Sequence, residues 1–191
     1  VIDLCPPFRG RRLYPVGRLD EDSEGIVILT NDGELTARLT HPRYAVPKVY
    51  DVRVKGLVTG ETARAFEGGV WLSDGRTGHS RVRLGKRGPR VSHVQVTLTE
   101  GRNREIRRVF AKLGHAVLSL RRVQIGPIVA RGLKMGQYRP LDPEEVAALR
   151  EVTEGRAAAP PRKRRAPAKG DGTLSRGGKP DPSAPPQRPS S

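Results

Sequence analysis

The stretch that decides the fold of this 191-residue chain reads Val16-Gly17-Arg18-Leu19-Asp20-Glu21-Asp22-Ser23-Glu24-Gly25-Ile26-Val27-Ile28-Leu29-Thr30-Asn31-Asp32-Gly33. Gly25 precedes a short apolar run, Ile26 to Leu29, and residues typical of turns end that run at 31–33. A buried strand that begins just after an acidic loop can fix a carboxylate at its edge. Asp20, which follows Arg18 by two residues, is a candidate for such a carboxylate, and a fixed position is what a nucleophilic or acid–base aspartate needs.

Local sequence leaves three interpretations of Asp20 open. Acidic neighbours such as Asp22 and Glu24 are typical of a solvated loop. Their spacing also imitates the first half of an EF-hand calcium loop, but the twelfth position is Asn31 rather than Glu, and the flanks do not read as helices. The third interpretation, a catalytic aspartate, depends on support from elsewhere in the chain.

The first support is a predicted strand over 49–55. Val52 and Val54 alternate with charged residues, so they occupy one face of the strand. Tyr50 shares their parity. Its ring is therefore expected to point inward, toward a core or a pocket.

The second support is a loop that leads into a predicted helix over 103–113. An apolar stripe recurs at i, i+3, i+4 and i+7 through Ile106, Val109, Phe110 and Leu113. Asn103 is the expected N-cap, and Gly114 is expected just beyond the C-terminal end. The other faces carry Arg104, Arg107 and Arg108, a pattern typical of a solvated or phosphate-contacting surface.

Together these segments resemble the pseudouridine synthases of the RsuA/RluB type, which isomerise uridine in ribosomal RNA. The matching motifs are Gly-Arg-Leu-Asp20 with Ser-Glu-Gly25, Leu-Thr-Asn-Asp-Gly33, Thr-His-Pro-Arg43, Lys-Val-Tyr50 with Val-Lys-Gly56, Glu-Gly-Arg-Asn-Arg-Glu-Ile-Arg-Arg108 and Gly-Pro-Ile128. The resemblance spans residues 13–149. The Asn103-Arg104-Glu105 stretch is more similar to the RluB branch, which acts on large-subunit rRNA.

The resemblance implies roles for particular residues. It makes Asp20 the catalytic aspartate, Tyr50 the active-site tyrosine and Arg107 the basic residue that pairs with the aspartate. These roles are chemically coherent, because a nearby guanidinium keeps a nucleophilic aspartate ionised and an aromatic ring can hold a pyrimidine taken out of an RNA stack. The expected RNA contacts are Arg18, Lys48, Arg102, Asn103, Arg104 and Arg108.

The family reaction breaks the N-glycosidic bond of uridine, turns the detached uracil and joins C5 to the ribose. The residues leave open whether the aspartate attacks the base or the ribose. No redox step or group transfer occurs, so no cofactor and no metal are expected. The four histidines are also too scattered to suggest a zinc site.

The chain departs from the family pattern at its start. It begins at Val1, and the small RNA-binding module and the Lys-Pro-x-Gly strand that usually open this family are absent from the sequence. The sequence is thus expected to enter the family mid-domain, with the first strand of the catalytic sheet missing.

Composition agrees with a polyanionic partner. The net charge is +16, of which 155–191 contributes +7 and 1–154 contributes +9. The segment 155–191 holds nine Lys/Arg and eight of the seventeen prolines, so it is expected to be a disordered tail, either solubilising or attracted to rRNA. We expect a cytoplasmic monomer that binds ribosomal RNA and no membrane, since no apolar run approaches a membrane span.

The expected fold class is α+β, a mixed and mainly antiparallel sheet with flanking helices, in one catalytic domain over 1–154. Strands are predicted near 26–30, 49–55, 80–84, 92–99 and 116–125, and helices near 33–40, 60–67, 103–113 and 143–151. The last helix is expected to begin with Asp142 as N-cap and Glu145 at N3. Phe66 and Trp71 are expected in the core.

Two other functions remain open at this point. One is a non-catalytic RNA-binding protein on the same fold. The presence of Asp20, Tyr50 and Arg107 together argues against it, because RNA binding alone does not require this combination. A glycosidase that pairs Asp20 with Glu24 is disfavoured by the basic surface and by the eight aromatic residues (Phe, Trp and Tyr together), too few for a sugar-binding platform.

Overall fold

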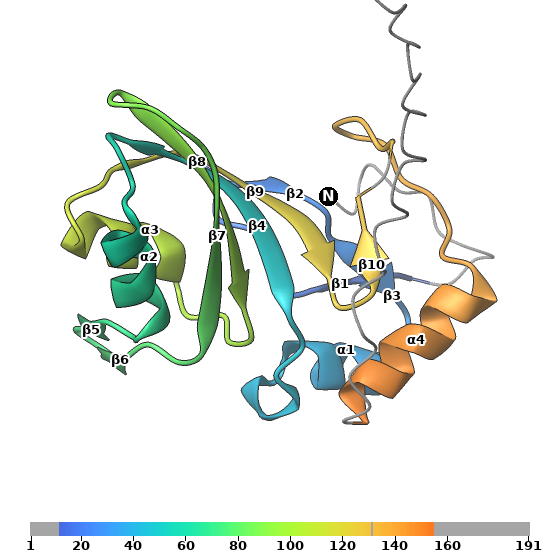
Figure 1. Ribbon diagram of the computed structural model, residues 1–191. Coiled ribbons are helices and arrows are strands. Elements are labelled where there is room, and N and C mark those ends of the chain that lie inside the picture. Colours follow the sequence, from blue (N-terminus) through green and yellow to red (C-terminus); the bar gives the residue numbers. More distant parts are fainter. Residues whose placement is uncertain (1–11, 131, 155–191) are drawn as a thin grey trace, which may run out of the picture. The chain divides into compact units, whose positions relative to one another are not determined.

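The computed structural model describes residues 12–130 and 132–154 (Figure 1). These residues all belong to the first of two units, Val1–Pro161, and the second unit, Arg162–Ser191, lies outside the described residues. The expected disorder of the tail 155–191 therefore also lies outside them. The account below concerns the first unit alone.

The centre of this unit is a sheet in the order β10-β9-β4-β8-β7. Its strands are β4 (Lys48–Lys55), β7 (Ser80–Arg87), β8 (Val91–Leu98), β9 (Val117–Ile125) and β10 (Ile128–Val129). All neighbours along this order are antiparallel, and the short β2 (Glu24–Gly25) adds to β9 in parallel. The expected mixed, mainly antiparallel sheet is confirmed.

Within residues 12–130 and 132–154, four helices accompany the sheet: α1 (Gly33–Thr40), α2 (Gly60–Glu67), α3 (Glu105–Lys112) and α4 (Pro143–Thr153). The first two have the predicted bounds, and side chains cap both. The Asp32 carboxylate accepts the Leu35 N–H at 2.9 Å, and the Thr59 hydroxyl accepts the Thr62 N–H at 3.2 Å. At α4 the Glu145 carboxylate accepts the Asp142 N–H at 3.0 Å, as the predicted capping box requires.

The start of α3 differs from the prediction. The helix begins at Glu105, and its N-cap position is Arg104 rather than Asn103. Arg104 has a φ of 47°, in the left-handed region, so the chain turns there and helical geometry starts only after it. Gly114, with a φ of 85°, follows the C-terminal end as predicted.

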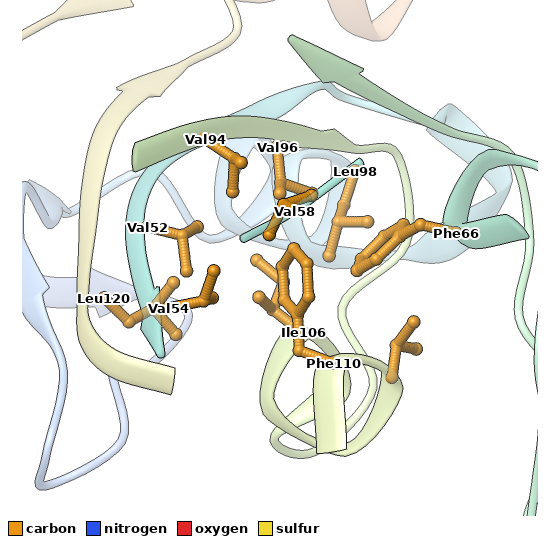
Figure 2. Close-up of a cluster of buried hydrophobic side chains, with 11 residues drawn as sticks. Val52, Val54, Val58, Phe66, Val94, Val96, Leu98, Ile106, Phe110 and Leu120 are labelled. Carbon is orange, nitrogen blue, oxygen red and sulfur yellow. The ribbon is translucent and has the colours of Figure 1, made fainter. Parts of the chain in front are cut away.

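A first apolar core lies between the sheet and the pair α2 and α3 (Figure 2). Phe66 of α2 and Phe110 of α3 meet with ring centroids 4.9 Å apart, over the valines of the central strands. Its buried members are Val52, Val54, Val58, Phe66, Val94, Val96, Leu98, Ile106, Val109, Phe110 and Leu120. Trp71, expected in this core, is 67% exposed instead.

A second apolar core joins the N-terminal strands to α1 and α4. Strand β1 (Tyr14–Val16) pairs with β3 (Ile28–Thr30), which is the part of the predicted strand 26–30 that forms. The buried members of this second core are Val16, Ile28, Leu35, Leu39, Val46, Ile125, Ile128 and Leu149. Ile125 of β9 belongs to this core and Leu120 of β9 to the first, so β9 contributes to both.

Three short elements complete the description. They are the 3-10 turn η2 (Pro42–Tyr44) and the hairpin formed by β5 (Trp71–Leu72) and β6 (Gly75–Arg76). Among the described residues, the longest helix is α4 with 11 residues, and no helix is long and apolar enough to cross a bilayer.

Candidate active site

The loop between β1 and β3 carries Asp20. Val16 of β1 and Ile28 of β3 are register partners, so the loop 17–27 begins and ends at the same edge of this strand pair. Within the loop, the Ser23 N–H donates to the Asp20 carbonyl at 2.9 Å and closes a tight turn. The Asp20 side chain is half-buried at this turn.

Gly25 allows the returning half of the loop to lie directly against β9. A Cβ at this position would lie 2.2 Å from the Arg122 carbonyl oxygen, and the φ of Gly25 is 126°. The neighbouring Ile26 N–H donates to that same carbonyl at 3.0 Å. The sequence motif Ser-Glu-Gly25 thus has a steric explanation, since no side chain fits at its last position.

Arg122 joins both ends of this loop to the sheet, and the sequence analysis did not single it out. Its Nε donates to the Ile26 carbonyl at 2.9 Å, and its Nη1 contacts the Arg18 carbonyl at 3.3 Å. The residue is 4% exposed, and its buried Nη2 has no hydrogen-bond partner among the described residues. The sequence held one signal for it, because Arg122 shares strand parity with the buried Leu120 and therefore puts a charge at an inward position.

Tyr50 lies directly across the sheet from Arg122, as register partners on β4 and β9. The ring packs against the first core, which confirms that it points inward. Burial raises the pKa of the Tyr50 hydroxyl, the positive charge of Arg122 opposes that shift, and the negative charge of Asp20 adds to it. Asp20, Tyr50 and Arg122 therefore gather at one place.

Arg107 contacts Asp22 rather than Asp20, which corrects the expected pairing. Its Nε lies 3.3 Å from an Asp22 carboxylate oxygen, and its Nη2 donates to the Asp22 carbonyl at 2.6 Å. Arg104 binds the same carboxylate with two hydrogen bonds of 2.8 Å. These contacts lower the pKa of Asp22, with the Arg104 hydrogen bond as the largest cause.

The correction has a geometric reason. Arg104 and Arg107 are three residues apart and meet on one side of the start of α3, where the turn that follows Asp20 presents Asp22. The two arginines therefore hold the loop through a neighbour of the aspartate. Sequence spacing alone could not decide which of the two carboxylates they contact.

The remaining predicted RNA-contact residues fall into two groups. Arg102 and Arg108 are engaged within the protein: Arg102 pairs with Glu100 at 3.0 Å, and Arg108 binds Asp74 with hydrogen bonds of 2.8 and 2.9 Å. Apart from Arg104, the second group consists of Arg18 and Asn103, which are both exposed, and Lys48, which is half-buried. Burial lowers the pKa of Lys48, and the charge of Arg122 adds to that effect.

A pair of carboxyl groups supports the turn before α3. One Glu105 oxygen accepts the Arg102 N–H at 3.2 Å, and Glu105 shares a hydrogen bond with Glu100. Glu105 is 4% exposed, and its burial together with the nearby Glu100 charge raises its pKa to about 7. Hydrogen bonds from Gly78 N–H and from Arg102 lower the pKa of Glu100 despite its own burial.

No group of three or more His, Cys, Asp or Glu side chains is arranged to hold a metal ion in the part of the chain that the structure describes. The site as described consists of one loop aspartate, one inward tyrosine and a set of arginines. Such a set can supply a nucleophile, an aromatic face and fixed positive charge.

Comparison with known proteins shows the family of the chain. A family model described as RNA pseudouridylate synthase matches residues 3–112, more than half of the chain. The chain belongs to this family. The match covers Asp20, Tyr50 and Arg107.

Relatives of the family extend the comparison. The ribosomal large subunit pseudouridine synthase B of Bacillus subtilis is 40% identical over 146 residues, which are 75% of this chain and 60% of that protein. An RNA pseudouridine synthase of Aquifex aeolicus is 41% identical over 138 residues, 72% of this chain and 55% of that protein. The chain spans between 40% and 60% of the length of the curated relatives that it matches.

A solved structure supports the fold assignment. The crystal structure of a pseudouridylate synthase superposes with a TM-score of 0.68 at 34% identity, over 72% of this chain and 59% of that one. The expected family fold is thereby confirmed.

Proposed function

We propose that this chain isomerises a uridine of ribosomal RNA to pseudouridine, with Asp20 as the nucleophile. Family membership supports the reaction type, and relatives named ribosomal large subunit pseudouridine synthase B support large-subunit rRNA as the substrate. The net charge of +16 fits a polyanionic substrate.

The roles proposed for Asp20 and Tyr50 rest on one observation. Arg122 is the register partner of Tyr50 and also hydrogen-bonds the Arg18 and Ile26 carbonyls on either side of Asp20. A single buried guanidinium therefore holds the aspartate loop next to the tyrosine. Proximity of this kind is what converts a carboxylate in a loop into an effective nucleophile.

The proposed roles follow from this arrangement. Asp20 forms a covalent bond to the nucleoside, and the C1′–N1 bond of uridine breaks. The detached uracil turns against the Tyr50 ring until C5 bonds to C1′ and the bond to Asp20 breaks. C5 then loses its proton and N1 gains one. The product has the same composition as the substrate and Asp20 is regenerated, so the proposed reaction needs no oxidant, no reductant and no second substrate.

The charged groups have supporting roles in this proposal. Arg122 is a positioning residue, and its Nη2, which is buried without a partner among the described residues, is available to a carbonyl oxygen of the base or to the Asp20 carboxylate. Arg104 and Arg107 hold Asp22 and thereby the far side of the loop. Arg18, Lys48 and Asn103 contact RNA directly, and the enzyme acts as a cytoplasmic monomer.

The test measures tritium released from an rRNA fragment that carries uridine labelled at C5, because only isomerisation removes that hydrogen. Asp20→Asn should abolish release and leave RNA affinity within a few-fold, since the shape is kept and phosphate contacts supply most affinity. Glu21→Gln, a change at the exposed neighbouring carboxylate, is the matched control and should retain turnover. Substantial release by Asp20→Asn would overturn the nucleophile assignment and favour a non-catalytic role for this residue.

A second variant tests Arg122. Arg122→Lys keeps the charge, but one ammonium group cannot replace a fork that reaches two carbonyls. We expect kcat to fall while KM for RNA changes little, because the loop, and not the RNA contact, is displaced. A change confined to KM would assign Arg122 to substrate binding instead.

A further inference from the structure

The β5–β6 hairpin presents Trp71 to solvent, although this is the only tryptophan in the chain. Its flanking residues Val70 and Leu72 pack against the first core, so strand alternation turns the indole outward, where it is 67% exposed. A tryptophan is large and mostly apolar, and its exposed ring offers a flat face on which a nucleic-acid base can stack.

The hairpin is held firmly by its surroundings. Its base is closed by reciprocal bonds, from Val70 N–H to the Thr77 hydroxyl at 2.9 Å and from Thr77 N–H to the Val70 carbonyl at 3.0 Å. Lys112 of α3 donates to the Trp71 carbonyl at 2.6 Å. The indole is therefore displayed on a fixed backbone, which reduces the entropy that a contact with it must overcome.

The side chains that reach the hairpin from α3 and the preceding turn are basic. Arg108 binds the Asp74 carboxylate, and Arg102 donates to the Arg76 carbonyl at 2.7 Å, while Lys112 contacts Trp71. Among the described residues, Lys112 and Arg76 contact carbonyl oxygens and no carboxylate. Positive charge thus remains beside the exposed indole.

The hairpin also lies at the same end of the sheet as the candidate active site. Ser80, at the start of β7 just after the hairpin, is in register with Leu98, and Leu98 is in register with Lys48, two residues before Tyr50. Figure 1 shows β5 and β6 to the side of the lower end of β7, below α2.

Helix α3 and its preceding turn connect the two places directly. Arg104 and Arg107 hold Asp22 beside Asp20, whereas Arg108 and Lys112 hold the hairpin. One helix therefore supports both the aspartate loop and the exposed indole.

We propose that the β5–β6 hairpin is a second RNA-contact surface, on which Trp71 stacks with an unpaired base that flanks the target uridine. Lys112 and Arg76 attract the phosphates of the same strand. The proposal rests on the proposed function, since it assumes an RNA substrate. An RNA strand fits this surface better than a second copy of the chain, because a copy with the same positive charge would be repelled.

The single tryptophan gives a direct readout, because all indole fluorescence of the chain comes from Trp71. Titration with a single-stranded fragment of large-subunit rRNA should quench this fluorescence and protect it from iodide. The same fragment with abasic nucleotides keeps every phosphate and should bind without quenching. Quenching that is equal for both fragments would show a charge effect and overturn the stacking proposal.

Variants complete the test with an end-labelled RNA, so that affinity is measured without the indole signal. Trp71→Ala should weaken binding about fivefold or more, the lower end of the loss expected for one base stacked on an aromatic ring, with an unchanged salt slope. Trp71→Phe should retain most affinity. Tyr138→Ala, at an aromatic residue that is also exposed, is the matched control and should bind like the unaltered chain. Equal affinity of Trp71→Ala and the unaltered chain would overturn the proposal.

Tritium release on the same fragment separates this proposal from the proposed function. Release without quenching overturns only the role of Trp71. Quenching by intact but not abasic RNA, without release, supports the hairpin surface and counts against the isomerase. A fluorescence change that depends on protein concentration in the absence of RNA would identify a second copy as the occupant and overturn the proposal.

Discussion

Replacement of the buried Glu105 by Gln should make the stability of this protein less sensitive to pH. In the folded chain, burial and the nearby Glu100 raise the pKa of Glu105 from 4.5 to about 7. The folded state therefore keeps a proton that the unfolded chain releases near pH 4.5. The glutamine side chain of this variant would imitate the protonated form, because its amide can still accept the Arg102 N–H and donate to Glu100.

The sign and size of the effect follow from linkage. Between pH 4.5 and 7 the folded state binds more protons than the unfolded state, so the free energy of unfolding falls as pH rises. At about 1.4 kcal/mol per pKa unit, the loss reaches at most about 3.5 kcal/mol above pH 7. Carboxylates whose pKa is lowered, such as Asp22 and Asp74, act in the opposite direction and mainly below pH 5. The range from pH 5 to 8 thus isolates Glu105.

Thermal unfolding at several pH values between 5 and 8 measures this prediction. Glu105→Gln should match the unaltered chain at pH 5 within about 1 kcal/mol and exceed it at pH 8, with Tm higher by at most about 10 °C. Glu151→Gln, at an exposed carboxylate of α4, should show no such pH-dependent difference. If the difference between Glu105→Gln and the unaltered chain does not change with pH, the proton is not held at this pair and the reasoning is refuted.

Three further predictions concern the aspartate loop and the tail. Gly25→Ala should lower turnover on the order of 100-fold, because the new Cβ would collide with the β9 backbone and displace the loop; normal tritium release from this variant would contradict the close approach. Arg107→Ala and Asp22→Asn should each lower turnover, and their effects should be less than additive in the double variant, since both remove the contact between the Arg107 guanidinium and the Asp22 carboxylate; additive losses in kcat would instead give Arg107 an independent role. Removal of 155–191, which carries a net charge of +7, should give a shallower salt dependence of RNA binding and a higher KM without changing the modified uridine; identical salt slopes would mean that the tail does not contact phosphate.

Much of the fold could be predicted from local patterns. The bounds of α1 and α2 follow from capping residues and apolar spacing, which act within one helical turn. The alternation of Val52 and Val54 likewise fixed the inward face of β4 and with it the direction of Tyr50. These properties depend on residues a few positions apart, so the sequence by itself determined them.

The partners of the charged and aromatic residues were decided only by the tertiary structure. Arg107 meets Asp22 across 85 positions, and Arg122 meets the Arg18 carbonyl across 104. No local period specifies such contacts, because they depend on how the first loop lies on β9, and that in turn depends on the space left at Gly25.

Trp71 illustrates the same limit from the apolar side. Hydrophobicity predicted a buried residue, but a two-residue strand with Val70 and Leu72 turned toward the core leaves the indole no inward position. The sequence thus determined which residue types were available for the proposed site, and the packing of loop, strand and helix decided which of them face each other and which face solvent. The physical reason is range: capping and alternation act between neighbours in the chain, whereas ion pairs and burial depend on surfaces that only folding brings together.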